Sequence, residues 1–154
     1  MHKPMRPFSI VALLLLGLTA QAKSDAALLD AIGDVETGHL ADQRKAIGRH
    51  GERGKYQMKA SAWSDANAQL KAEGRPTYSW LQWRDATAQD MMASAYLRCL
   101  KRRLSSLGMP NPSPTILALC WNRGLTGARN RGWQPNDYAE RVANLFDSQN
   151  ATAR

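Results

Sequence analysis

The chain has few residues of the types that bind metals or form disulfide bonds. Among 154 residues there are only two cysteines and three histidines, and they do not recur at the short spacings typical of metal ligands. We therefore expect no metal centre, and nothing in the sequence implies another cofactor. The chain also lacks an internal repeat or a long linker, which indicates one domain with one core.

Long apolar segments are also missing. The main apolar run, Phe8–Ala20, is too short to span a bilayer comfortably. A basic start precedes it and the small-x-small sequence Ala20-Gln21-Ala22 ends it, as in secretory signal peptides. We predict that residues 1–22 are such a signal, cleaved after Ala22, and that the mature protein is periplasmic or secreted. No cysteine follows to accept a lipid, so no stable membrane anchor is expected after cleavage; an uncleaved signal anchor is the alternative.

Acidic residues are scarce, with 13 Asp and Glu against 21 Lys and Arg. Without Lys3 and Arg6 of the predicted signal, 19 basic residues remain and the net charge is about +6. Such a chain should bind polyanions. Because we expect export, the anionic cell wall is a better partner than nucleic acid, which we do not expect to be bound.

Helical patterns dominate the rest of the chain, so we expect a mainly α fold of five to six helices. The expected helices cover residues 25–37, 61–73, 87–107, 114–121 and 137–147, the third opened by a capping box at Thr87–Asp90 and the fourth by Ser113-Pro114. Glycines punctuate residues 46–58, where we expect a small hairpin or a pair of short strands. Residues 23–149 would form the domain and residues 150–154 a flexible tail.

One carboxylate is placed to act as a general acid. Leu28, Ile32 and Val35 follow the i, i+4, i+7 spacing of a buried helix face, and Glu36 lies at its edge. Partial burial disfavours the charged form, so the pKa of Glu36 should exceed that of a free glutamate. A protonated carboxyl group can donate to a leaving oxygen, as cleavage of a glycosidic bond requires. A solvated glutamate at a helix end is the alternative.

Four short segments follow one another along the chain: Glu36-Thr37-Gly38, Gly54-Lys55-Tyr56-Gln57-Met58, Trp121-Asn122-Arg123-Gly124, and Tyr138 with Arg141-Val142. In this order they resemble the soluble lytic transglycosylase family of the lysozyme superfamily. That family has Glu-Ser-Gly at a helix end, a Gly-Leu-Met-Gln hairpin, a Tyr-Asn-x-Gly helix end and a late tyrosine. The resemblance covers roughly residues 28–146 and departs from the family at Lys55-Tyr56, where the family has Leu-Met.

The resemblance implies an α+β lysozyme-like fold whose hairpin lines a substrate cleft, and a peptidoglycan glycan strand as substrate. Glu36 would protonate the oxygen between N-acetylmuramic acid and N-acetylglucosamine. It would then act as a base while the muramoyl 6-hydroxyl attacks the anomeric carbon, leaving a 1,6-anhydro end. The residues that would contact the glycan are Gln57, Tyr56, Met58, Trp121, Asn122 and Tyr138. For Tyr56, Asn122 and Tyr138, packing or helix capping is the alternative.

Two other functions remain open. A hydrolytic muramidase needs two carboxylates, about 5 to 9.5 Å apart, and Glu52 could be the partner of Glu36. The basic neighbours Arg49, His50 and Arg53 favour instead a solvated charge at a loop tip. The second function is that of a non-catalytic wall-binding or secretion-assembly component with the same fold. Any of these proteins could associate with a wall-spanning secretion or pilus machine.

The two cysteines, Cys99 and Cys120, lie on successive expected helices. An antiparallel helix pair would bring them within a turn or two of each other. An oxidising compartment favours a disulfide between them. Two buried free thiols that fill helix contacts are the equally open alternative.

Overall fold

The computed structural model describes residues 7–152, and the side chains of residues 21–151. Five α-helices form the described fold: α1 (Pro7–Thr37), α2 (Ala60–Ala72), α3 (Ala86–Ser106), α4 (Pro114–Asn130) and α5 (Asp137–Thr152). Two 3-10 helices, η1 (Gln43–Lys45) and η2 (Trp80–Arg84), lie in the connections. The described part of the chain contains no strand, so it is all-α, and the prediction of a mainly helical fold is confirmed.

The expected hairpin does not form strands, which is a correction to the α+β prediction. Residues 46–58, called the glycine-rich loop below, contain only isolated antiparallel bridges, Ile47 with Arg53 and Arg53 with Met58. Gly51 and Gly54 have φ angles of 86° and 72°, a region that glycine adopts without strain. The chain therefore reverses twice within this short segment, and neither bridge has room to extend into a ladder.

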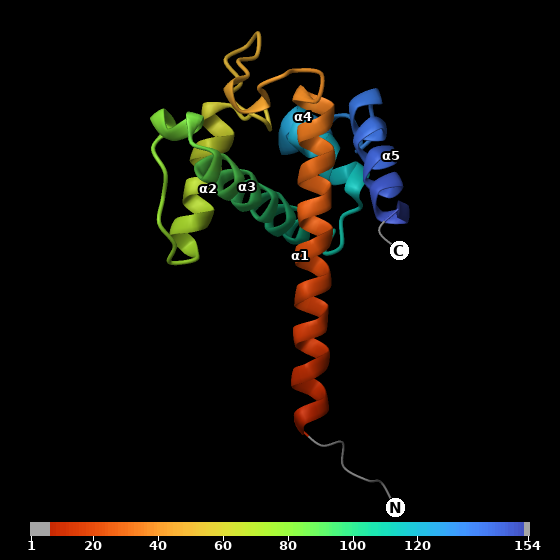
Figure 1. The fold of residues 1–154 in the computed structure, drawn as a ribbon. Coiled ribbons are helices and arrows are strands. Elements are labelled where there is room, and N and C mark those ends of the chain that lie inside the picture. The colour runs from red at the N-terminus through yellow and green to blue at the C-terminus, as the bar shows by residue number, and fades with distance from the viewer. Residues whose placement is uncertain (1–6, 153–154) are drawn as a thin grey trace, which may run out of the picture.

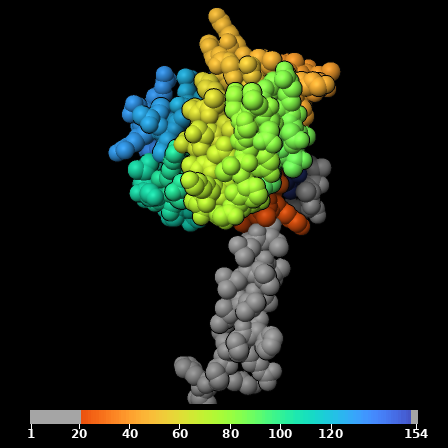
Figure 2. All heavy atoms as spheres, turned by 90° about the vertical axis from the view of Figure 1, so that its left-hand side faces the viewer, coloured from red at the N-terminus to blue at the C-terminus, as the bar shows by residue number. Residues whose placement is uncertain are grey.

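The helices pack as two groups that α3 connects. On one side α2 packs along α3, and on the other α5 packs against both α1 and α4 (Figure 1). Helix α3 also contacts α1 and α4. The glycine-rich loop lies at the end of α1 that carries Thr37, and the space-filling view shows it above α2, at the top of the molecule (Figure 2).

Helix α3 is central because it is apolar around most of its circumference. Its buried hydrophobic residues are Ala88, Met92, Ala93, Ala95, Tyr96, Leu97, Cys99, Leu100 and Leu104. Leu28 and Ile32 of α1 and Leu70 of α2 join these residues, except Cys99, in one core. Each fully buried side chain of the size of leucine contributes about 1.5–3 kcal/mol to folding. The face predicted for Leu28 and Ile32 is therefore a core face, and Val35 packs at its margin.

The helix starts agree only partly with the sequence predictions. Ser113 caps α4 as expected, because its hydroxyl accepts from the N–H of Ile116 and Pro114 occupies the first turn. The expected capping box at Thr87–Asp90 is wrong. Asp85 caps α3 by accepting from the N–H of Ala88 at 2.7 Å, which leaves the Asp90 carboxylate free for contacts outside the helix.

Three helices are longer than predicted. Helix α1 is continuous from Pro7, since no breaker separates the apolar run from residue 25. Helix α4 passes Trp121 and contains a break at Gly124, whose φ and ψ are 71° and 159°. Helix α5 includes residues 150–152 of the expected tail, and residues 153–154 lie outside the described part.

Of the predicted signal peptide, residues 1–6 lie outside the described residues and residues 7–20 are described as helical backbone only. Cleavage after Ala22 thus stays a prediction. Within the described part of the chain, no helix combines the length and the apolar character that crossing a membrane requires.

Candidate active site

A cleft of about 380 Å³ opens where the end of α1, the glycine-rich loop, the start of α2 and the break in α4 meet. Six of the predicted site residues line it: Glu36, Glu52, Gln57, Met58, Trp121 and Asn122. They come from three segments that are far apart in the sequence. Side chains that the sequence reasoning did not propose for the site also line the cleft, namely Arg49, Lys59, Ser61, Ala62, Tyr96 and Arg123.

The end of α1 holds Glu36 beside the glycine-rich loop. The next residue, Thr37, is buried, and its hydroxyl donates to the carbonyl of Gly33 at 3.1 Å and to that of Lys55 at 2.9 Å. The helix stops at Gly38, whose N–H closes the last turn on Asp34. Because Thr37 is bonded to both the helix and the loop, Glu36 is fixed at the boundary between them.

The surroundings of Glu36 favour its protonated form. Burial raises the pKa of Glu36 above its ordinary value and outweighs the lowering effect of the Tyr138 hydroxyl. The negative charge of Glu52 raises this pKa further, whereas Arg141 lowers it. A raised pKa makes a carboxyl group at the edge of a cleft better suited to act as a general acid.

Tyr138, on α5, lies beside Glu36 but outside the wall of the cleft itself. Burial, and then the Glu36 charge, raise the pKa of Tyr138 well above its ordinary value, so its hydroxyl stays protonated. The hydroxyl is buried and has no formed hydrogen bond with any described residue. The two groups affect each other's pKa, although their geometry is not that of a formed hydrogen bond. The hydroxyl is therefore an unused hydrogen-bond donor next to the carboxyl group of Glu36.

Glu52 is not the solvated loop charge that its basic neighbours suggested. Only 16% of its side chain is exposed, and it lines the same cleft as Glu36. One oxygen accepts from the N–H of His50 at 2.8 Å and the other lies 3.5 Å from the Lys59 ammonium group. Desolvation raises the pKa of Glu52. The backbone N–H groups of His50 and of Glu52 itself, together with Lys59, outweigh this effect, so the pKa lies below its ordinary value. Glu52 is therefore ionised.

Gln57 reaches the cleft through an unusual backbone conformation. Its φ of 45° lies in the left-handed region, which residues other than glycine rarely adopt. The Gln57 side chain donates to the carbonyl of Gly54 at 2.9 Å, which stabilises the turn. A Cβ on Gly48 would lie only 2.4 Å from the Gln57 amide oxygen and 2.5 Å from a Glu52 oxygen. The absence of a side chain at Gly48 thus allows both groups to occupy the cleft wall.

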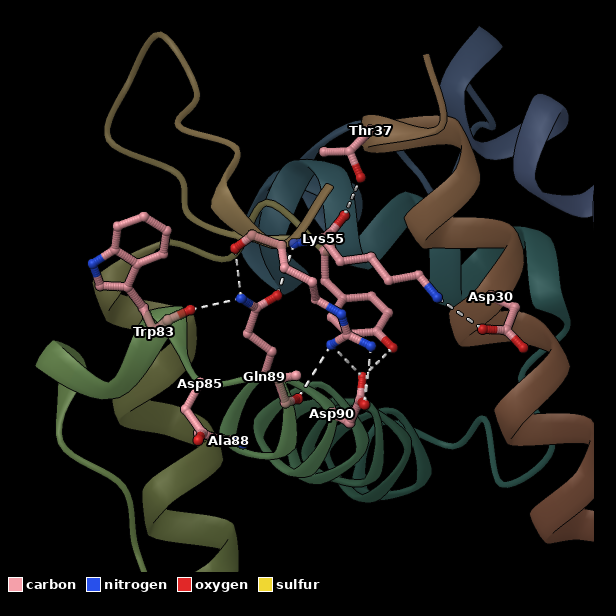
Figure 3. Close-up of polar contacts among 11 residues, drawn as sticks. Asp30, Thr37, Lys55, Trp83, Asp85, Ala88, Gln89 and Asp90 are labelled. Carbon is pink, nitrogen blue, oxygen red and sulfur yellow. Dashed lines mark hydrogen bonds and ion pairs between the residues drawn. The ribbon is translucent and has the colours of Figure 1, made fainter. Parts of the chain in front are cut away.

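A buried amide of α3 anchors the glycine-rich loop from below (Figure 3). Gln89 is 2% exposed and accepts from the N–H of Lys55 at 2.9 Å. Its amide nitrogen donates to the carbonyls of Arg44 at 2.8 Å and Trp83 at 2.7 Å. A Cβ on Gly54 would collide with this amide, at 2.4 Å. One side chain therefore satisfies three backbone groups from three different segments.

Tyr56 does not line the cleft, contrary to its expected role as a substrate contact. It is 4% exposed, and its hydroxyl donates to Asp90 at 2.7 Å. Asp90 also accepts two hydrogen bonds from Arg44, at 2.8 and 3.1 Å. The Tyr56 carbonyl accepts from the indole of Trp121 at 3.2 Å. Tyr56 thus fastens the loop to α3 through its hydroxyl and to α4 through its carbonyl, and it does not line the cleft.

Two residues of the α4 segment Trp121-Asn122-Arg123-Gly124 differ in exposure: Trp121 is packed and Asn122 is accessible. Trp121 is 9% exposed and packs edge-on against Tyr96, with ring centroids 5.1 Å apart. Asn122 is exposed, and its amide oxygen accepts from Asn136 at 2.9 Å. Its amide nitrogen has no partner among the described residues and is free to bind a ligand. Tyr96 was missed from the sequence because its spacing is that of any core residue of α3.

The cysteines lie away from the cleft. Cys99 and Cys120 are both buried and both carry free thiols in the structure. Burial raises the pKa of Cys120 to about 11. The alternative of a disulfide in an oxidising compartment stays a prediction. Among the described residues no group of His, Cys, Asp or Glu is arranged to hold a metal ion.

No protein family, curated protein or solved structure matches this chain. The interpretation of the cleft therefore depends on its own geometry and on the order of the four motifs.

Proposed function

We propose that the protein is a peptidoglycan lytic transglycosylase, which cleaves the β-1,4 bond between N-acetylmuramic acid and N-acetylglucosamine. The observation that carries the proposal is Glu36, a carboxyl group at the edge of a cleft whose pKa is raised by burial. The order of the four motifs supports it, because three of them contribute side chains to one cleft and the fourth lies next to Glu36.

In this proposal Glu36 performs both proton transfers. It first donates its proton to the oxygen that leaves with N-acetylglucosamine. The resulting carboxylate then takes the proton of the muramoyl 6-hydroxyl while that oxygen bonds to the anomeric carbon, which closes the 1,6-anhydro ring. The Tyr138 hydroxyl stabilises the intermediate carboxylate by donating a hydrogen bond. Gln57 and Asn122 bind hydroxyl or N-acetyl groups, and no water molecule is consumed.

One observation favours a second candidate, a hydrolytic muramidase. The environments of the cleft push the pKa of Glu36 up and that of Glu52 down, and such a pair suits an acid and a base. The first candidate remains preferred because both Glu52 oxygens are already engaged, one by Lys59 and one by the N–H of His50. These contacts hold the pKa of Glu52 below its ordinary value, which makes Glu52 a weaker base.

The experiment that separates the candidates is digestion of purified peptidoglycan sacculi by the protein without residues 1–22. Mass spectrometry of the released fragments distinguishes anhydromuramic ends from reducing ends, which are heavier by one water. Anhydro ends support the transglycosylase and reducing ends the muramidase. Binding without release of fragments would favour a non-catalytic wall-binding or secretion-assembly component.

The proposed substrate requires export, so we propose a periplasmic or secreted protein, as the predicted signal peptide suggests. Such an enzyme could open the wall for a secretion or pilus machine. Expression of the full chain in a bacterium with two membranes tests the location. A mature protein in the periplasm or medium that begins at Lys23 supports the proposal, whereas an intact chain in the cytoplasm contradicts it.

A further inference from the structure

Two arginines of the cleft have no acidic partner. Arg49, on the glycine-rich loop, and Arg123, next to the break in α4, both line the cleft and are both exposed. Neither guanidinium group forms a hydrogen bond or an ion pair with another described residue. The two carboxylates of the cleft do not neutralise them, because Glu52 contacts Lys59 and His50, and Glu36 lies beside Tyr138.

Three other arginines, which join elements of the fold, form ion pairs with acidic side chains. Arg44 pairs with Asp90 at 2.8 Å, Arg98 with Glu73 at 2.7 Å and Arg103 with Asp65 at 2.7 Å. Arg44 and Arg103 each donate two hydrogen bonds to the carboxylate of a neighbouring segment. Arg49 and Arg123 thus differ from these structural arginines, since they line the cleft and their guanidinium groups have no carboxylate partner among the described residues.

We propose that Arg49 and Arg123 bind a carboxylate on the substituent that the glycan carries beside the bond to be cleaved. This inference rests on the proposed function and adds a specificity to it. A neutral sugar backbone offers hydroxyl and amide groups, which Gln57 and Asn122 can bind without a cation. A guanidinium group instead matches a carboxylate in shape and charge and can donate two parallel hydrogen bonds to it.

In peptidoglycan such a carboxylate has two sources. The lactyl group of muramic acid carries one when the peptide has been removed, and the peptide itself carries several. The cleft would therefore discriminate against a glycan of the same backbone without acidic substituents, such as a chitin oligosaccharide. It would also concentrate acidic strands at the site by electrostatic attraction.

The test is a binding measurement with three glycans of similar length: strands with peptides, strands freed of peptides by an amidase, and chitohexaose. Glu36→Gln protein, which cannot cleave, is titrated with each by calorimetry. The same titrations are made after adding Arg49→Gln or Arg123→Gln. Lys71→Gln serves as the control, because it removes one positive charge from an exposed position of α2 that does not line the cleft.

We expect each arginine change to weaken binding of carboxylated strands about tenfold, as the loss of a charged hydrogen bond does. Binding of chitohexaose should change less than about twofold, and Lys71→Gln should change neither. A loss only on strands freed of peptides assigns the lactyl carboxylate, and a loss only with peptides assigns the peptide carboxylates. A loss on both kinds of strand shows that the arginines bind either carboxylate. Equal losses on all three glycans, or none, would overturn the inference.

Cleavage by the unsubstituted protein is measured on the same strands. If these strands are cleaved but the arginine variants bind normally, the inference fails and the proposed function stands. If binding depends on the arginines but no strand is cleaved, the proposed activity fails and the carboxylate site stands.

Discussion

The Tyr138 hydroxyl of α5 lies beside the Glu36 carboxyl group of α1, close enough that each changes the pKa of the other. The contact depends on the packing of α5 along α1, which brings the last helix to the end of the first. This arrangement gives Glu36 a neighbouring hydrogen-bond donor, which can stabilise the charged form of Glu36 during a reaction.

Replacing Glu36 by glutamine should abolish cleavage and leave the fold intact. Glutamine has the same shape but cannot donate the proton, so the rate should fall at least about 10²-fold. Fragment release from sacculi measures the rate, and circular dichroism checks the fold. A folded variant that keeps a tenth or more of the activity would show that Glu36 is not the acid.

The Tyr138→Phe variant should shift the pH profile of cleavage to higher pH. The hydroxyl lowers the pKa of Glu36, so its loss raises that pKa further and extends the protonated form to higher pH. The alkaline limb of kcat/KM should shift to higher pH while the maximal rate falls. Stability should change little, because the lost hydroxyl has no formed hydrogen bond among the described side chains. An unchanged pH profile would argue against contact between the two groups during catalysis.

Replacing Glu52 by glutamine separates a mechanism with one carboxylate from a mechanism with two. If Glu36 acts alone, the maximal rate should stay within about tenfold of the original, since Glu52 supports the cleft wall but transfers no proton. The alkaline limb should move to lower pH, because the charge of Glu52 raises the pKa of Glu36. A muramidase would instead lose several orders of magnitude in rate, and its products would carry reducing ends.

The Gln89→Leu change should destabilise the protein and loosen the glycine-rich loop. It leaves the N–H of Lys55 and the carbonyls of Arg44 and Trp83 without their partner, and each unsatisfied group costs about 1–3 kcal/mol. Urea unfolding should show a loss of at least about 2 kcal/mol. Gln134→Leu, at an exposed position, is the matched control and should change stability by less than about 0.5 kcal/mol.

The cysteines should react with a thiol reagent only after unfolding. Both are buried and free, and burial raises the pKa of Cys120, so little thiolate is accessible in the folded state. Titration should give two thiols in denaturant and none without it. Absence of thiols in denatured protein taken from an oxidising compartment would show that Cys99 and Cys120 are joined.

Helical periodicity was sufficient to place Glu36. Leu28 and Ile32 are buried as their spacing indicated, and the side chain that follows Val35 therefore had to lie at the edge of that face. The cap of α4 was equally local, because Ser113 and Pro114 are specific for the first turn of a helix. Such features depend on neighbours within a turn or two, and the order of residues determines them directly.

The roles of Tyr56 and Gln57 do not follow from local periodicity. The resemblance placed both residues in the cleft, but only Gln57 lines it. Gln57 faces the cleft because a positive φ turns the chain there, and Tyr56 faces the core because Asp90 and Trp121 bind it from two other helices. The burial of Glu52 likewise depends on Lys59 and on the missing side chain at Gly48. Adjacent residues of a loop have no fixed period, so contacts with distant helices decide which of them forms the site.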